Sequence, residues 1–192
     1  MDLSRSFSGV ALATAVGVCL LAALSPASAE ATKASKASID RGKYIVQTGG
    51  CGDCHSPKVM GPQGPVEHPT LALSGHQAST KIPDVPQGVL GQGKWGALGS
   101  PDLTAWAGPW GISFAANLTP DPGTGIGSWT EQMFIDAIRK GKHLGAGRPI
   151  LPPMPWQVFS RKTDQDLKDV YAYLMSLKPV QNKVPDPIPP KQ

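Results

Sequence analysis

Three segments of the chain repeat apolar residues at the spacing of an amphipathic α-helix. The first covers residues 39–47, with Ser38 as its predicted cap, and the second covers residues 130–140. The third begins after Thr163, where Asp166 three residues on completes a capping-box pattern. The apolar positions are Ile39, Tyr44, Ile45 and Val46, then Met133, Phe134, Ala137 and Ile138, then Leu167, Val170, Tyr171 and Leu174. We predict one helix in each segment.

A long stretch rich in glycine and proline, residues 58–116, separates the first two predicted helices. It contains MGPQGP, VPQGVLGQGKWGALGSP and WAGPWG, and apolar and polar residues do not alternate cleanly there. We predict loops, short turns and a brief strand pair in this insertion. A loop of this length needs something to order it, and a large apolar cofactor would do so. The proline-rich tail, residues 179–192, is expected to lie extended on the surface or to be mobile.

The N-terminal residues have the pattern of a secretory signal peptide. A basic start with Arg5 precedes an apolar run from about Val10 to Leu24, and small residues lead to a predicted cut after Ala29. An uncleaved membrane anchor is the alternative, although the apolar run is short for a spanning helix. Cleavage leaves 163 residues, which is one ordinary domain. We therefore predict a signal peptide at 1–29, a linker at 30–37, one domain at 38–178 and export to the periplasm.

Charge and cysteine content narrow the function classes. The chain has 18 basic and 14 acidic residues, a net charge of +4. This modest excess suits an acidic protein surface and is too small to argue for nucleic acid. Cleavage would remove Cys19 and leave Cys51 and Cys54, so the mature chain has no cysteines for a network of structural disulfides.

The two remaining cysteines lie in the stretch GCGDCH, residues 50–55, which has three interpretations. A thioredoxin-type dithiol belongs in a βαβ context, and no such alternation of strands and helices is visible. A structural zinc site needs four ligands, and the adjacent Cys54 and His55 are poorly placed to bind one ion together. Covalent haem attachment requires this order, with two thiols for the vinyl groups and His55 for the iron. One motif predicts one haem c.

The second axial ligand has several candidates. Met154 is favoured because Pro153 and Pro155 flank it on a stiff loop after the second predicted helix, which would hold a weak thioether ligand in place. A bis-histidine haem, with His76 preferred over His68, is the alternative. The other side chains considered are Met60, close after His55; Met133 and Met175, on predicted helices; and His143, at a helix end.

Four stretches together resemble class I cytochromes c, and among them the exported cytochromes that serve periplasmic dehydrogenases. They are DRGKYIVQTGGCGDCHSP, ANLTPDPGTGIGSWTEQMFIDAIRKGKH, LPPMPW and TDQDLKDVYAYLMSLKPV. The resemblance implies a mainly α cytochrome c fold, with three principal helices around one covalent haem and the first and third helices crossing near Gly42 and Tyr171. It implies thioether bonds from Cys51 and Cys54, His55 and Met154 as iron ligands, and Asn117 and Trp129 lining the haem pocket near a propionate. The insertion has no counterpart in small cytochromes c.

A haem iron with both axial positions filled has no open site for substrate, so it transfers electrons and does not act as an enzyme. We expect electrons to arrive from an exported dehydrogenase and to leave toward a respiratory oxidase or another cytochrome. The alternatives are a tightly bound dehydrogenase subunit and, with less support, a haem enzyme of the peroxidase or sulfur-oxidising type. Contact with a membrane would come only through partners or an uncleaved anchor. A basic cluster forms either a solvated face or a rim for partners and propionates: Arg139, Lys140, Lys142, Arg148, Arg161 and Lys162.

Overall fold

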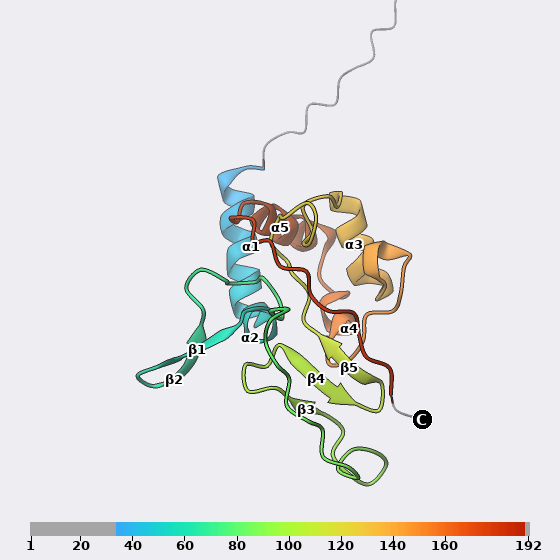
Figure 1. Cartoon of the computed structure of the whole chain (residues 1–192). Coiled ribbons are helices and arrows are strands. Elements are labelled where there is room, and N and C mark those ends of the chain that lie inside the picture. The colour runs from blue at the N-terminus through green and yellow to red at the C-terminus, as the bar shows by residue number, and fades with distance from the viewer. Residues whose placement is uncertain (1–33, 191–192) are drawn as a thin grey trace, which may run out of the picture. The chain divides into compact units, whose positions relative to one another are not determined.

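The structure is a computed structural model that describes residues 34–190. The predicted signal peptide and Cys19 lie outside the described residues. The helices are α1 (Lys36–Thr48), α2 (Cys51–His55), α3 (Glu131–Lys140), α4 (Trp156–Phe159) and α5 (Asp164–Met175), with a short 3₁₀ helix, η1 (His143–Gly145). The strands are β1 (Lys58–Gly61), β2 (Gly64–Glu67), β3 (Leu98–Gly99), β4 (Ala105–Gly108) and β5 (Gly111–Phe114) (Figure 1).

Helices α1, α3 and α5 occupy the three segments where the apolar spacing predicts them. At α5, Thr163 accepts a hydrogen bond from the Asp166 amide and the Asp166 side chain accepts one from the Thr163 amide, so the capping box is present. Helix α1 begins earlier than predicted, because the Ser35 side chain caps it by accepting from the Ser38 amide at 3.1 Å. The Ser38 hydroxyl instead donates to Asp169 on α5. The short helices α2 and α4 were not predicted.

Helices α1 and α5 pack side by side and cross at Gly42 (Figure 1). A Cβ atom at Gly42 would lie 1.8 Å from the Asp169 carbonyl oxygen and 2.9 Å from Tyr173 Cβ, so this approach requires glycine. Gly42 meets Asp169 and Tyr173, which lie on either side of Tyr171 in the sequence, so the helices cross close to the expected position. The Tyr171 hydroxyl donates to the Trp129 carbonyl at 2.6 Å and ties α5 to the segment before α3.

The buried core joins the helices to two loops. Leu73 comes from the insertion and Ile126 from the turn before α3. The core residues are Ile45, Val46, Leu73, Ile126, Phe134, Val170 and Leu174. The insertion therefore contributes to the same core as the helices.

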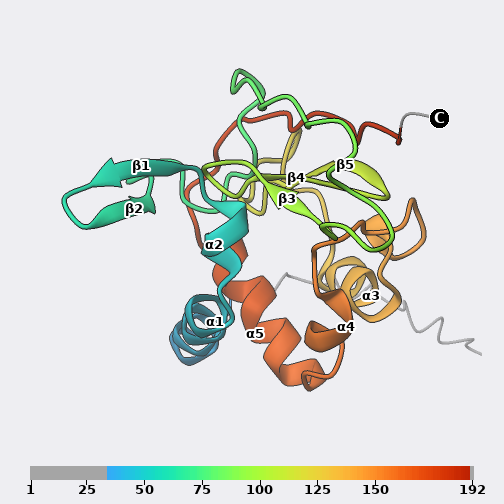
Figure 2. The ribbon, with the colours of Figure 1, turned by 90° about the horizontal axis from the view of Figure 1, so that it is seen from below.

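The insertion contains more regular structure than its sequence predicts. Strands β1 and β2 form an antiparallel hairpin that projects away from the helices, and β3, β4 and β5 form an antiparallel sheet (Figure 2). The expectation of loops with one brief strand pair was therefore incomplete. The strands have two to four residues each, which is too short for a period-two pattern to stand out. In β5 the buried positions are Gly111 and Ser113, so alternation is present without apolar side chains to mark it.

The C-terminal tail extends from α5 along the loops to the edge of β5 (Figure 1). The Val180 amide donates to the Thr119 hydroxyl at 3.0 Å, and the Asn182 side chain is buried. Farther on, Ile188 and Ile112 exchange two backbone hydrogen bonds of 2.8 and 2.9 Å. The tail is thus extended and held at three points along its length.

Candidate haem site

The motif CGDCH forms α2, a single short helix directly after α1. Gly50 turns the chain between the two helices with a φ of +67°, in the left-handed region that favours glycine. Lys58 closes the other end, since its Nζ donates to the carbonyl oxygens of Gly52 at 2.8 Å, Asp53 at 3.0 Å and Ser56 at 2.6 Å. A cation at the carboxyl end of a helix satisfies carbonyls that have no partner within it. The helix that carries the motif is therefore fixed at both ends.

His55 is 9% exposed and is held in a defined orientation. Its Nδ1 lies 2.8 Å from the Ala116 carbonyl oxygen, which can only accept, so Nδ1 carries the proton. Nε2 is then the nitrogen with a lone pair, as a metal ligand requires. Burial lowers the pKa of His55, although the bond to Ala116 opposes the shift, and the ring is neutral at pH 7. The ring is thus prepared to bind a metal through Nε2.

The two cysteines are half-buried thiols on one face of this short helix. Burial raises the pKa of Cys51 to about 11, and burial followed by the charge of Asp53 raises the pKa of Cys54. A dithiol oxidoreductase needs a lowered thiol pKa, so the redox interpretation is disfavoured. Across residues 34–190, no three side chains of His, Cys, Asp or Glu converge on one point as ligands of a single metal ion would. In haem attachment the two thiols bond to the vinyl groups and the imidazole binds the iron, so the three side chains need not meet at one ion, and this arrangement fits.

The methionines considered as iron ligands lie in different settings. Met154 is half-buried in the loop between η1 and α4, and its carbonyl accepts from the Trp156 amide at 2.9 Å. Met60 is 80% exposed on the β1–β2 hairpin, and Met133 is 40% exposed on α3. Met175 packs against the apolar core. Met154 alone among these four combines partial burial with a position outside the helices, the core and the hairpin.

His76 is buried beside His55. It is 1% exposed, and its Nδ1 lies 2.7 Å from the Thr104 hydroxyl. Its neighbour Gly75 donates to the His55 carbonyl at 2.7 Å, and its own amide donates to the Ala115 carbonyl at 2.9 Å. The backbone at Gly75 and His76 therefore lies against the segments that carry and hold His55, and the His76 ring is already engaged by Thr104.

The other two histidines, His68 and His143, each make a contact that places them near the motif or the expected haem pocket. The His68 amide donates to the Pro57 carbonyl at 2.8 Å, which places His68 close after the motif. His143 is exposed, and its ring meets the Trp129 ring edge-on at 5.1 Å between centroids. The structure therefore places His143 against one of the residues expected to line the haem pocket.

Asn117 and Trp129 take part in the structure around the motif. The Asn117 side chain is 4% exposed; it donates to the Val180 carbonyl at 2.8 Å and accepts from the Thr119 amide and hydroxyl at 3.0 and 2.7 Å. It thereby fixes the chain directly after Ala116, the residue that holds His55. Trp129 packs against the apolar core.

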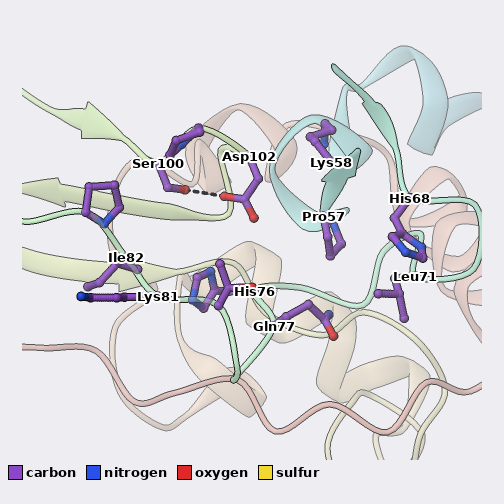
Figure 3. Close-up of a pocket in the computed structure, with 13 residues that line it drawn as sticks. Pro57, Lys58, His68, Leu71, His76, Gln77, Lys81, Ile82, Ser100 and Asp102 are labelled. Atoms are coloured by element: carbon purple, nitrogen blue, oxygen red, sulfur yellow. Dashed lines mark hydrogen bonds between the residues drawn. The ribbon is translucent and has the colours of Figure 1, made fainter. Parts of the chain in front are cut away.

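A pocket of about 370 Å³ lies next to Pro57 and Lys58, the residues that follow the motif helix (Figure 3). His76, Lys81 and Asp102 line it, and Ser100 donates to Asp102 at 2.6 Å. Although burial opposes the shift, hydrogen bonds from Ser100 and Thr104 lower the pKa of Asp102. The pocket lining includes neither the motif cysteines nor Met154, so this pocket is not where the haem would be attached.

Two members of the basic cluster are engaged within the molecule. Arg139 binds Asp164 and the Ser160 carbonyl, and Lys140 Nζ lies 2.9 Å from Asp136 on its own helix. Lys162 is close enough to Cys51 for its charge to oppose the rise in the thiol pKa. Of these three members, two thus form internal ion pairs and the third lies near Cys51.

No helix within residues 34–190 has the length and apolar character needed to cross a membrane.

Comparison with known proteins agrees with the motif. The family model for cytochrome c matches residues 39–178. The cytochrome c subunit of a quinone alcohol dehydrogenase from Gluconobacter oxydans is 32% identical over 95% of this chain and 30% of its own length. One of the subunits of nicotinate dehydrogenase from Pseudomonas putida is 30% identical over 79% of this chain and 10% of its own. The fructose dehydrogenase cytochrome subunit from Gluconobacter japonicus is 38% identical over 42% of this chain and 17% of its own.

The chain therefore corresponds to less than a third of the length of these relatives. The family match covers most of the sequence and includes the attachment motif, the buried histidine and the Met154 loop. From the motif, the orientation of His55 and this match together, the chain belongs to the cytochrome c family.

Proposed function

We propose that this protein is an electron-transfer protein with one covalent haem c. Cys51 and Cys54 form the thioether bonds, His55 Nε2 binds the iron from one face and Met154 from the other. The observation that carries the proposal concerns His55, which directly follows Cys54 in the sequence. His55 Nδ1 donates a hydrogen bond to the Ala116 carbonyl, and this leaves Nε2 free to bind the iron. The haem would supply reversible one-electron chemistry at this position.

Met154 is the preferred distal ligand because the surroundings of the other side chains give each of them another role. The His76 ring is engaged by the Thr104 hydroxyl, Met175 packs against the core, and Met60 is exposed on a hairpin. A methionine opposite a histidine raises the reduction potential relative to two histidines. The half-buried Ile150 and Leu151, three to four residues before Met154, would exclude water on that side.

Asn117 and Trp129 would bound the pocket in different ways. The Asn117 amide is occupied by Thr119 and Val180, so its contribution is to hold the Ala116 carbonyl against His55. Trp129 would present its ring as an apolar wall, since Tyr171 holds its carbonyl. With both axial positions filled by protein, the chain does not carry out substrate chemistry itself.

The partners we propose are an exported dehydrogenase as electron donor and a respiratory oxidase or another cytochrome as acceptor, in the periplasm. Three relatives are named as subunits of alcohol, nicotinate and fructose dehydrogenases, which supports the donor class. They also support the alternative of a tightly bound subunit. Size-exclusion chromatography of native extracts, followed by a haem stain, separates the two: a free carrier elutes near its own mass of 20.1 kDa or slightly below it.

Replacement of Met154 tests the ligand assignment. In Met154→Ala the haem should remain attached, because the thioether bonds do not involve the iron. The weak long-wavelength sulfur-to-iron band of the oxidised protein should disappear, the potential should fall, and cyanide should bind the ferric iron. Met133→Ala is the control, since it removes a methionine that is 40% exposed on α3. A band that survives in Met154→Ala would mean that another residue binds the iron.

A further inference from the structure

We propose that Ser113 is a positioning residue for the distal ligand, through a hydrogen bond from the insertion to the Met154 loop. Ser113 lies on β5 and is 8% exposed. Its Oγ donates to the Pro152 carbonyl at 2.6 Å, two residues before Met154. The inference rests on the proposed role of Met154 and adds a function for the insertion, to which the family resemblance assigns none.

The direction of the Ser113 hydrogen bond is set by its neighbours. Trp110 Nε1 donates to Ser113 Oγ at 3.2 Å, so the hydroxyl oxygen accepts there and its hydrogen is available for a carbonyl. The Trp106 carbonyl lies at 3.4 Å and the Pro152 carbonyl at 2.6 Å. Since one hydroxyl has one hydrogen, the shorter contact to Pro152 is the bond that forms.

The Met154 loop has few other ways to be held. Pro152, Pro153 and Pro155 have no amide hydrogen, so Met154 has the one amide donor in this part of the loop and the other backbone groups that can be bound are carbonyl oxygens. The Ile150 amide donates to the Gly141 carbonyl at 2.8 Å, and the Trp156 amide donates to the Met154 carbonyl at the start of α4. The bond from Ser113 therefore lies between the anchor at Ile150 and the local turn at Met154.

The same stretch of chain also reaches His55. Strand β5 continues into Ala115 and Ala116, and the Ala116 carbonyl accepts from His55 Nδ1. From Ser113 to Ala116 an extended chain covers about 10 Å. One short stretch, β5 and the two residues after it, therefore contacts the loop of the proposed distal ligand at Ser113 and the proposed proximal ligand at Ala116. Pairing with β4 holds Ser113 and Phe114, and beyond the strand the Ala115 amide donates to the Thr104 carbonyl at 2.8 Å.

The strand would thereby fix the distance between the two ligand-bearing segments. The bond between a thioether and iron is weak, so its stability depends on how closely the loop holds the sulfur in place. Loss of the Ser113 hydroxyl should free the loop at Pro152, while the haem remains attached through the cysteines. The expected consequence is easier displacement of Met154 by an added ligand.

Imidazole titration of the oxidised holoprotein measures this displacement. In Ser113→Ala we expect imidazole to bind about tenfold more tightly than in the wild type, the equivalent of one lost hydrogen bond. Ser100→Ala is the matched control, because Ser100 is also 8% exposed in the insertion and donates to Asp102 instead of to the loop. It should leave the imidazole affinity within about twofold of the wild type.

The outcomes separate this inference from the proposed function. If Met154→Ala opens the iron and Ser113→Ala binds imidazole like the wild type, the positioning role is wrong and the ligand assignment stands. Equal changes in Ser113→Ala and Ser100→Ala would also overturn it, because general loosening of the insertion would explain both. If Met154→Ala leaves the sulfur-to-iron band in place, the ligand assignment itself fails. Should Ser113→Ala yield no holoprotein, Trp110→Phe removes the donor to Ser113 and should give a two- to threefold change in the same direction, on the order of half a hydrogen bond.

Discussion

Asn182→Ala should destabilise the protein far more than a substitution in an extended tail normally does. The Asn182 side chain is 7% exposed and binds three backbone groups in the insertion. Its Nδ2 donates to the Ser74 carbonyl at 2.9 Å and the His76 carbonyl at 2.8 Å, and its Oδ1 accepts from the Ala78 amide at 3.3 Å. Alanine would leave all three groups without this partner.

The size of the effect follows from these contacts. Each buried polar group left without a partner costs about 1–3 kcal/mol, and water entering the vacated space recovers part of that loss. We therefore expect a loss of about 3 kcal/mol in the free energy of unfolding. For a protein of this size, 1 kcal/mol corresponds to about 2–4 °C in Tm, so the melting temperature should fall by about 6–12 °C.

Thermal unfolding of the holoprotein, followed by circular dichroism, measures the difference. Gln181→Ala is the matched control, since Gln181 is the exposed neighbour of Asn182 and should leave Tm within about 2 °C of the wild type. Equal melting temperatures for the two variants would refute the reasoning. The tail would then lie on the insertion without stabilising it.

Two further substitutions test the packing of α1 against α5 and the buried, neutral imidazole of His76. Gly42→Ala should lower the free energy of unfolding by about 3 kcal/mol or more, because the alanine methyl group would meet the Asp169 carbonyl. Urea titration measures this loss, and Lys43→Ala, at an exposed neighbouring position, is the control. Burial lowers the pKa of His76 while Asp102 opposes the shift, so the folded state stays neutral where the unfolded chain takes up a proton. Stability should therefore fall as pH drops below about 6.5, by at most about 1.4 kcal/mol per pH unit for this one group. Urea titrations at several pH values should show a smaller fall in His76→Gln, and an unchanged slope would contradict this role.

The sequence alone predicts the elements that have strong local signals. Thr163 and Asp166 identify the start of α5, and apolar spacing locates α1 and α3. The order of Cys51, Cys54 and His55 predicts a haem attachment motif because the chemistry depends on that order. These features share one property: neighbours in the sequence provide the whole signal.

The surroundings of the motif could not be predicted in this way. His55 is held by a backbone carbonyl 61 residues away, and any residue type can supply a carbonyl. Asn182 reaches carbonyls more than 100 residues earlier, from a tail whose prolines predict only extended chain. The short strands of the insertion bury Gly111 and Ser113, which carry no apolar signal. Long-range contacts through backbone groups and small polar residues leave no periodic pattern in the sequence.

Long-range contacts of this kind also show that the insertion is an integral part of the domain. Ser113 reaches the loop before Met154, Ala116 holds His55, and Leu73 enters the core between the helices. The tail then binds the insertion at Asn182 and at Ile188, so the insertion is held on more than one side. A surface appendage would make its hydrogen bonds within itself, whereas this segment makes them to His55, to the loop before Met154 and to the tail. The glycine- and proline-rich stretch, whose sequence predicts irregular loop, is therefore part of the framework that holds His55 and the Met154 loop in place.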